Sequence, residues 1–185
     1  MWPAERHVRM RWANGGGWTT EIIAEPSSTM WEWRLSVADV DAAGPFSVFP
    51  DVDRTIALLR GNGFALSFAG DTEDVVISEP FQPFEFSGDE VTSCRLIDGP
   101  VQDLNLMTRR DSADRRLEFV HLPPRAVTEI GGKDVVVVVA GGVRIGERDL
   151  GYLDAIRPVS PARTLNVMSS GEGAVLASVT VPNDR

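Results

Sequence analysis

The sequence alternates between short runs rich in β-branched and aromatic residues and turns rich in glycine and proline. The chain contains 17 glycines and 12 prolines, and patterns with the period of a helix are nearly absent. Glycine and proline bound strands, so this punctuation predicts many short strands. Such strands are typical of a sandwich or barrel, and we predict an all-β fold. The predicted strands span residues 18–24, 31–40, 55–61, 63–70, 74–80, 91–97, 117–122, 134–141, 163–169 and 174–181.

The run WEWRLSVADV, residues 31–40, alternates apolar and polar side chains. Successive residues of a strand face opposite sides of the sheet. The pattern therefore predicts a strand with one apolar face and one polar face. The apolar face carries Trp31, Trp33, Leu35 and Val37, and the polar face carries Glu32, Arg34 and Ser36.

A weak internal repeat relates the two halves of the chain. Residues 56–68 and 135–147 each contain an apolar run, a glycine turn and a second run, and each is followed by a further predicted strand pair, at 84–97 and 165–181. A hairpin, a crossing segment and another hairpin make half a jelly roll, so two copies predict a bicupin. We expect two cupin-like β-barrel or jelly-roll halves packed as one compact unit. The predicted halves are residues 1–100 and 101–185.

Charge is distributed unevenly and excludes some classes of partner. The formal net charge is -9. Residues 1–100 hold 7 Arg and 16 Asp or Glu, whereas residues 101–185 hold 11 basic and 11 acidic residues. An acidic surface repels phosphate groups, so we expect neither nucleic acid nor an anionic membrane as a partner.

Cysteine content and hydropathy favour a cytoplasmic protein. Cys94 is the single cysteine, so no disulfide can form within the chain. The first ten residues lack the apolar region of a signal peptide. The longest apolar run, residues 135–143, is far shorter than the roughly 20 residues that span a membrane.

Metal and cofactor chemistry find little support in the sequence. Metal-binding cupins resemble one another in a His-x-His pair, a nearby Glu and a later His, but His7 and His121 are the only histidines here. No loop shows the alternating carboxylates of a Ca²⁺ or Mg²⁺ site, and no phosphate-binding glycine motif occurs. We expect no metal and no cofactor. A catalytic pair of Cys94 and His121 is less favoured than a buried core cysteine and a strand-end histidine.

The segment ANGGGWTTEI, residues 13–22, carries three consecutive glycines and allows two interpretations. In the first, Asn-Gly forms a type I′ hairpin turn and a further glycine forms a bulge. In the second, the glycine backbone approaches a ligand and its N–H groups bind an anion. The polar row that follows suits the wall of a pocket. The candidate residues are Asn14, Gly15, Gly16, Gly17, Thr19 and Glu21.

Several motifs, in the right order, resemble those of the HutD/Ves family. WANGGGWTTEI (12–22) is similar to its Trp-x-Asn-Gly-Gly-Gly-x-Thr-x-Glu opening, although Thr20 stands where the family often has Arg. Residues 33–63 contain its Trp-Arg-x-Ser-x-Ala, Gly-x-Phe-Ser-x-Phe and Asp-Arg elements, and DGPVQDLNLMTRR (98–110) resembles its Gly-Pro-x-x-Asp-x-Asn-x-Met-x-Arg-Arg segment. The likeness is specific over residues 11–110 and general after them.

The resemblance implies a bacterial bicupin without a catalytic metal, associated with histidine utilisation. It implies binding of a small acidic metabolite, such as formylglutamate or urocanate, and restraint of pathway output. No established catalytic activity comes with the family.

Further binding residues follow from strand faces and side-chain chemistry. A guanidinium suits a carboxylate ligand, and polar residues that alternate along one strand suit a ligand-filled interior. Each candidate also has a structural interpretation: Arg54 could pair with Asp51 or Asp53, Arg34 with Glu21 or Glu32, and Asn105 could cap a loop. The candidates are Arg34, Ser36, Arg54, Asp103, Asn105 and Met107.

Three functions remain open from the sequence. The first is a non-catalytic protein that binds a small acidic metabolite. The second is a metal-independent isomerase, hydrolase or lyase with Glu21 and Asp103 as general acid and base. The third is an interaction scaffold whose surface is the acidic stretch 71–90 with exposed Phe81 and Phe84. A homodimer is a further expected partner state.

Overall fold

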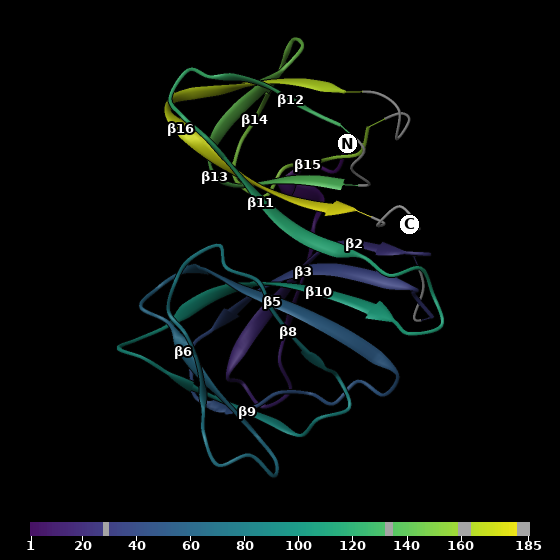
Figure 1. The fold of residues 1–185 in the computed structure, drawn as a ribbon, viewed down its shortest axis with the longest axis vertical. Coiled ribbons are helices and arrows are strands. Elements are labelled where there is room, and N and C mark those ends of the chain that lie inside the picture. Colours follow the sequence, from purple (N-terminus) through teal and green to yellow (C-terminus); the bar gives the residue numbers. More distant parts are fainter. Residues whose placement is uncertain (28–29, 132–134, 159–163, 181–185) are drawn as a thin grey trace. The chain divides into compact units, whose positions relative to one another are not determined.

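The computed structural model describes residues 1–27, 30–131, 135–158 and 164–180 (Figure 1). Apart from a short 3-10 helix, η1 (Ala4–Arg6), the regular structure of these residues is strand, and the all-β prediction is confirmed. No helix among them is long and apolar enough to cross a membrane. Residues 134, 163 and 181, which bound three predicted strands, lie outside the described residues.

Contacts divide the chain into two units. The first unit is Val8–Ala113, and the second combines Met1–His7 with Asp114–Arg185. The boundary predicted between residues 100 and 101 therefore differs from the observed one. It falls just before a strand that pairs on both sides within the first unit, and such long-range pairing leaves no local signal in the sequence.

The first unit consists of two antiparallel sheets around one apolar core. Buried residues from both sheets share this core, among them Ile56, Leu58, Phe64 and Leu66. The larger sheet has the order β1 (Val8–Arg11), β2 (Gly17–Glu25), β3 (Trp33–Val40), β10 (Val101–Arg109), β5 (Val52–Arg60) and β8 (Phe84–Ser87). The smaller sheet has the order β4 (Gly44–Pro45), β9 (Thr92–Leu96), β6 (Phe64–Phe68) and β7 (Val75–Ile77).

The second unit is a sheet built on two long strands with an aliphatic core. Its core cluster includes Val136, Val138, Val167 and Leu176. The sheet has the order β11 (Arg116–Leu122), β16 (Leu165–Thr180), β13 (Val135–Ile145) and β14 (Arg148–Leu150); β12 (Val127–Ile130) pairs with β16 and β15 (Ala155–Ile156) pairs with β13.

The strand pairs predicted at residues 84–97 and 165–181 are not hairpins in the structure. The strands of segment 84–97 do not pair with each other: β8 pairs with β5, and β9 pairs with β6 in the other sheet. Segment 165–180 is one continuous strand, β16. The turn-like residues 87–90 therefore lie where the chain passes from one sheet to the other. The turn-like residues 170–173 lie within a single strand.

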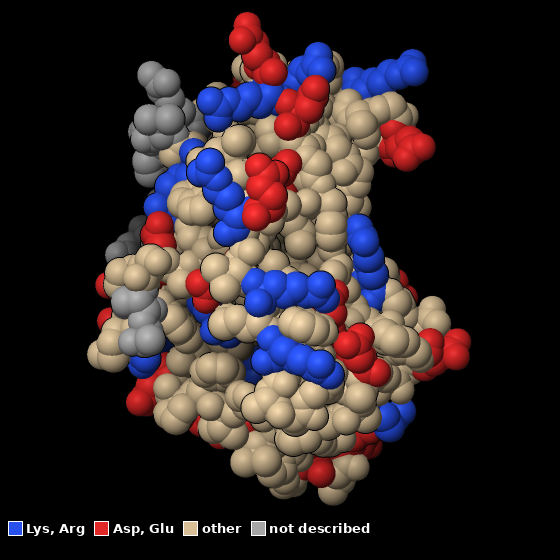
Figure 2. All heavy atoms as spheres, turned by 180° about the vertical axis from the view of Figure 1, so that it is seen from behind, with Lys and Arg blue, Asp and Glu red and all other residues tan. Residues whose placement is uncertain are grey.

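Charge on the face shown in Figure 2 is mixed rather than segregated. Basic and acidic side chains lie interspersed over it. The structure also contains exposed ion pairs, such as Arg110 with Asp53 and Arg144 with Asp149. Exposed pairs of this kind add little to stability, and no extended basic surface gathers on this face.

Candidate functional site

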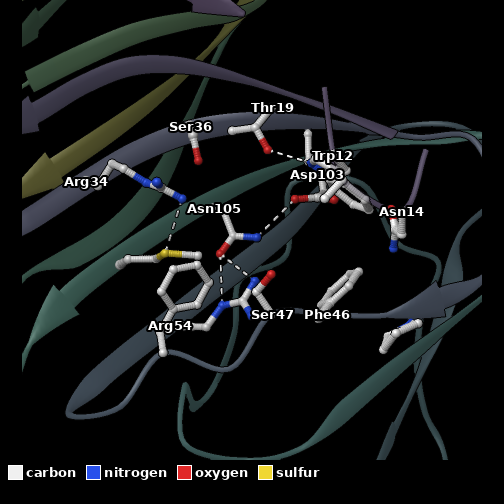
Figure 3. A pocket seen from close by; sticks show the side chains of 15 residues that line it. Trp12, Asn14, Thr19, Arg34, Ser36, Phe46, Ser47, Arg54, Asp103 and Asn105 are labelled. Atoms are coloured by element: carbon white, nitrogen blue, oxygen red, sulfur yellow. Dashed lines mark hydrogen bonds between the residues drawn. The ribbon is translucent and has the colours of Figure 1, made fainter. Parts of the chain in front are cut away.

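A cavity of about 450 Å³ lies in the first unit. Strands β2, β3, β5 and β10 supply most of its polar side chains, and two loop segments supply the rest (Figure 3). Its lining residues are Trp12, Ala13, Asn14, Thr19, Arg34, Ser36, Ala38, Pro45, Phe46, Ser47, Phe49, Arg54, Asp103, Asn105 and Met107.

Strand register brings the polar residues together. On the paired strands β3 and β10, Arg34 lies opposite Met107 and Ser36 opposite Asn105. Arg54 of β5 lies opposite Met107 from the other side. Because alternate residues share a face, one side of three adjacent strands points into the cavity. The predicted alternation holds within β3, with Arg34 and Ser36 on the cavity side, but Trp31 precedes the strand and its ring lies beside the Arg34 guanidinium instead of on the opposite face.

Arg54 is held deep in this cavity by an amide and three aromatic rings. Its Nε and Nη2 atoms donate hydrogen bonds to Asn105 Oδ1, at 3.3 and 3.2 Å. Its guanidinium carbon lies 5.4, 5.7 and 4.7 Å from the ring centroids of Phe46, Phe49 and Phe86. Burial lowers the pKa of Arg54 to about 10, partly opposed by the charge of Asp103, so the guanidinium stays protonated at neutral pH.

The alternative interpretation, in which Arg54 pairs with a neighbouring aspartate of its own segment, is therefore wrong: its hydrogen-bond partner is Asn105. Asp53 pairs instead with Arg110, whose Nε lies 2.7 Å from Asp53 Oδ1. Asp53 is exposed and Arg54 is 5% exposed, so adjacent residues of β5 point to opposite faces.

Asp103 is a buried carboxyl with half of its hydrogen-bonding capacity unused. It is 1% exposed. Its Oδ1 accepts a hydrogen bond from Asn105 Nδ2 at 3.2 Å, and its Oδ2 has no hydrogen-bond partner among the described residues. Burial raises the pKa of Asp103 to about 7, against the lowering effects of Asn105 and Arg54. The group can therefore exchange a proton near neutral pH.

Arg34 presents the less restrained guanidinium. Its Nη2 makes a long contact of 3.6 Å with Met107 Sδ, and its Nε has no hydrogen-bond partner among the described residues. The rings of Trp31 and Phe49 lie 5.6 and 5.8 Å from its guanidinium carbon. Burial lowers the pKa of Arg34, opposed by the charge of Glu21.

The three glycines shape a loop that borders the cavity but do not line it. The Gly15 N–H donates to the Trp12 carbonyl and the Gly16 N–H to Asn14 Oδ1, both at 3.0 Å. These two donors are used within the loop, which argues against an anion nest. The predicted type I′ turn is also wrong, because that turn needs positive φ at both central residues and Asn14, unlike Gly15, does not have it.

Close packing accounts for the third glycine. A Cβ on Gly17 would overlap the carbonyl oxygen of Asp39 on the neighbouring strand. The Gly16 carbonyl accepts hydrogen bonds from the N–H groups of Asp41 and Ala42, at 2.9 and 3.2 Å. These two hydrogen bonds hold the glycine loop against residues 41–42, which directly follow β3. Asn14, in the same loop, lines the cavity.

Eight of the twelve residues predicted for the site line this one cavity, and four do not. The four are Gly15, Gly16, Gly17 and Glu21. Glu21 pairs opposite Ser36, on the same face of β2 as Thr19, and its charge acts on Arg34, but it does not itself line the cavity. Thr19 lines the cavity and accepts a hydrogen bond from Trp12 Nε1 at 2.8 Å.

Sequence reasoning missed the segment of residues 45–49 as part of the site. Pro45, Phe46, Ser47 and Phe49 all line the cavity. The Gly-x-Phe-Ser-x-Phe motif over residues 44–49 was an available signal, because an aromatic pair that flanks a hydroxyl suits a binding wall.

The remaining sequence candidates do not line this cavity. Cys94 is 3% exposed in the core cluster, and burial raises its pKa to about 12, so it remains a thiol at neutral pH. His121 belongs to the other unit. Among the described residues, no group of three or more His, Cys, Asp or Glu is placed to hold a metal ion. Phe84 packs against Phe68 and Phe86, so it does not form the exposed surface predicted for a scaffold.

Comparison with known proteins places the chain in a family. A protein from Pseudomonas putida, named as an uncharacterized 21.2 kDa protein in the hutC 3′ region, is 36% identical over 118 residues, which are 63% of this chain and 61% of that protein's length. Protein Ves from Citrobacter koseri is 37% identical over 140 residues, 74% of this chain and 71% of Ves.

Structural similarity extends over nearly the whole chain. A solved structure of HutD from Pseudomonas fluorescens SBW25 superposes with a TM-score of 0.77 at 34% identity, covering 98% of both chains. The predicted all-β, cupin-like fold is thereby confirmed. The family model described as HutD matches residues 4–177. With the same fold and the family's sequence pattern throughout, this chain belongs to the HutD family.

Proposed function

We propose that this protein binds a small acidic metabolite of histidine degradation, of the formylglutamate or urocanate class, and modulates the output of that pathway without catalysis. The observation that carries the proposal is the pair of guanidiniums, Arg34 and Arg54, that face one cavity of the first unit. Family membership and the hut-region relative supply the pathway context.

The two guanidiniums have different tasks in this proposal. The fork of Arg54 is occupied by Asn105, so Arg54 contributes a fixed positive charge and orients that amide. Arg34 keeps its Nε free of hydrogen-bond partners among the described residues and receives the ligand carboxylate. A planar guanidinium and a carboxylate form a strong, directional pair, especially where water is excluded.

Aromatic and hydroxyl groups complete a suitable environment for a small acid. Trp12, Phe46 and Phe49 provide apolar walls, while Ser36 and Ser47 provide hydroxyl groups that can orient a polar ligand. Small-molecule sites usually combine such apolar walls with a few polar groups, and their volumes run from about 300 to 1,000 Å³.

The test is a thermal-shift titration with urocanate, formylglutamate, formiminoglutamate, glutamate and histidine. A ligand that binds only the folded state stabilises it by about 2.7 kcal/mol at one hundred times its dissociation constant. We expect a dose-dependent shift for at least one acid, and its loss in Arg34→Gln and Arg54→Gln. Arg60→Gln, at the exposed end of the strand that carries Arg54, is the control and should keep the shift. The same response in all variants, or none with any acid, contradicts the proposal.

A metal-independent enzyme is the second candidate, and the state of Asp103 favours it. A carboxyl that burial brings to a pKa of about 7, beside an open cavity, is suited to general acid–base catalysis. Glu21 does not line this cavity, so the pair proposed from sequence reduces to Asp103 alone. Product formation from any of the five compounds, abolished in Asp103→Asn, would replace the binding proposal. Unchanged compounds after prolonged incubation would exclude turnover of these five.

A further inference from the structure

The hydrogen bonds between Arg54, Asn105 and Asp103 have only one possible direction. A guanidinium donates and cannot accept, so the Asn105 amide must turn its oxygen to Arg54 and its N–H groups to Asp103. Figure 3 shows this chain of contacts along the cavity wall. As a result, Asp103 Oδ1 is occupied and Oδ2 is left over.

Two buried polar atoms, on residues that line the same cavity, are left without hydrogen-bond partners among the described residues. Asp103 Oδ2 and Arg34 Nε each lack a hydrogen bond within the described part of the chain. Most buried polar groups in folded proteins are paired, so such atoms call for an explanation. One is a donor with positive charge and the other is an acceptor once its carboxyl is ionised.

Strand register separates these two atoms along the cavity. Arg34 lies opposite Met107, and Ala38 lies opposite Asp103, so the two positions are four residues apart along β10. At about 3.3 Å per residue, their backbones are about 13 Å apart, with Ser36 and Asn105 between them. Side chains reach inward from both ends, which leaves room for a small molecule with two polar ends.

Charges from each neighbouring strand act on Asp103. Arg54 on β5 attracts its ionised form, while Asp39 on β3 disfavours it. Cys94 on β9 remains a neutral thiol at the pH of the test and adds no charge. Asn105, on the same strand, donates a hydrogen bond to it.

We propose that the ligand is an acid with a hydrogen-bond donor, such as an N–H group, at the end opposite its carboxylate, and that Asp103 Oδ2 selects this donor while Arg34 holds the carboxylate. This inference rests on the proposed function and deepens it. A site that hydrogen-bonds a ligand group rejects an analogue without that group, because its own polar atom would stay buried and unpaired.

The test compares matched acids at pH 8, where Asp103 is ionised and can only accept. Urocanate is paired with 3-(2-furyl)acrylate, in which a furan replaces the imidazole and no ring N–H remains. Formylglutamate is paired with 2-(formyloxy)glutarate, in which an ester oxygen replaces the formamide N–H and the formyl carbonyl remains. By isothermal titration calorimetry, we expect the N–H acid to bind about tenfold more tightly or better in at least one pair, since discrimination by a lost hydrogen bond in a buried site reaches this size easily.

Asp103→Asn supplies the second arm. The new amide would offer its oxygen to Asn105 and turn an N–H group to the ligand, so the preference within that pair should fall towards equality. Asp39→Asn is the matched control: it removes a nearby carboxylate whose oxygens bond Arg9 and Gln102 instead of lining the cavity, and the preference should persist.

The outcomes separate the two proposals. Acids that bind equally well with and without the N–H group overturn the role of Asp103 and leave the binding proposal intact. A preference that survives in Asp103→Asn also overturns it. If no acid binds the parent protein, the binding proposal fails and this inference fails with it. Should Asp103→Asn not fold, the comparison of acids on the parent protein decides by itself.

Discussion

Asp103→Asn should change how the stability of the first unit depends on pH. In the unfolded chain the carboxyl of Asp103 ionises with a pKa near its ordinary value of 3.8, whereas burial raises the pKa in the folded protein to about 7. Between these values the folded state holds a proton that the unfolded state has lost. The contribution to stability is complete below about pH 4, falls as pH rises through 7, and is constant above it.

The size of this effect follows from the difference between the two pKa values. That difference is roughly 3, and one pKa unit corresponds to about 1.4 kcal/mol, so the full loss is about 4 kcal/mol. About 3 kcal/mol of it falls between pH 5 and pH 8. An asparagine at this position has no proton to lose, so the variant lacks this dependence. Other groups titrate in both proteins and cancel in the comparison.

Urea unfolding of both proteins at several pH values measures the effect. All the tryptophans except Trp2 lie in the first unit, so their fluorescence reports mainly on the unit that carries Asp103. We expect the free energy of unfolding of the parent, relative to Asp103→Asn, to fall by about 3 kcal/mol from pH 5 to pH 8. Parallel pH profiles for the two proteins would refute the reasoning, because they would show that Asp103 titrates alike in the folded and unfolded chains.

Three further predictions concern the glycine loop, the cysteine and the cavity wall. Gly17→Ala should lower the free energy of unfolding by about 1–3 kcal/mol, because the new Cβ meets the Asp39 carbonyl. In Gly15→Ala the new Cβ meets only Arg11 Nη2, at an ordinary contact distance of 3.9 Å, but φ stays positive, so this change should cost about 1 kcal/mol; equal losses by urea unfolding would contradict the difference. Cys94 should react with a thiol reagent only as fast as the protein unfolds, and rapid reaction of the native protein would show that it is accessible. A bound acid should change tryptophan fluorescence through Trp12, and an undiminished change in Trp12→Phe would place the ligand elsewhere.

Part of the site could be predicted because strand geometry is local. Alternation along residues 31–40 placed Arg34 and Ser36 on one face, and the same rule joined Asp103, Asn105 and Met107 on another strand. These predictions need only the two-residue period of a strand. The same rule put Glu21 on the face of Thr19, and its charge does act on Arg34, but Glu21 itself does not line the cavity.

The interactions that set the chemistry could not be predicted in this way. Arg54 could have paired with either neighbouring aspartate, and only the fold shows that Asn105 holds it. The pKa of Asp103 depends on burial, which in turn depends on strands far away in the sequence. The purpose of Gly17 depends on a carbonyl that a neighbouring strand brings close.

The sequence by itself determined the strand content, the polar faces of individual strands and the resemblance to the HutD family, because periodicity and motifs are properties of neighbouring residues. Only the tertiary structure decided which strands lie side by side, where one unit ends, and which polar atoms remain unpaired within a shared cavity. Those features arise when residues about 40 to 75 positions apart are brought within contact distance, and neither burial nor hydrogen-bond partners are set before that has happened.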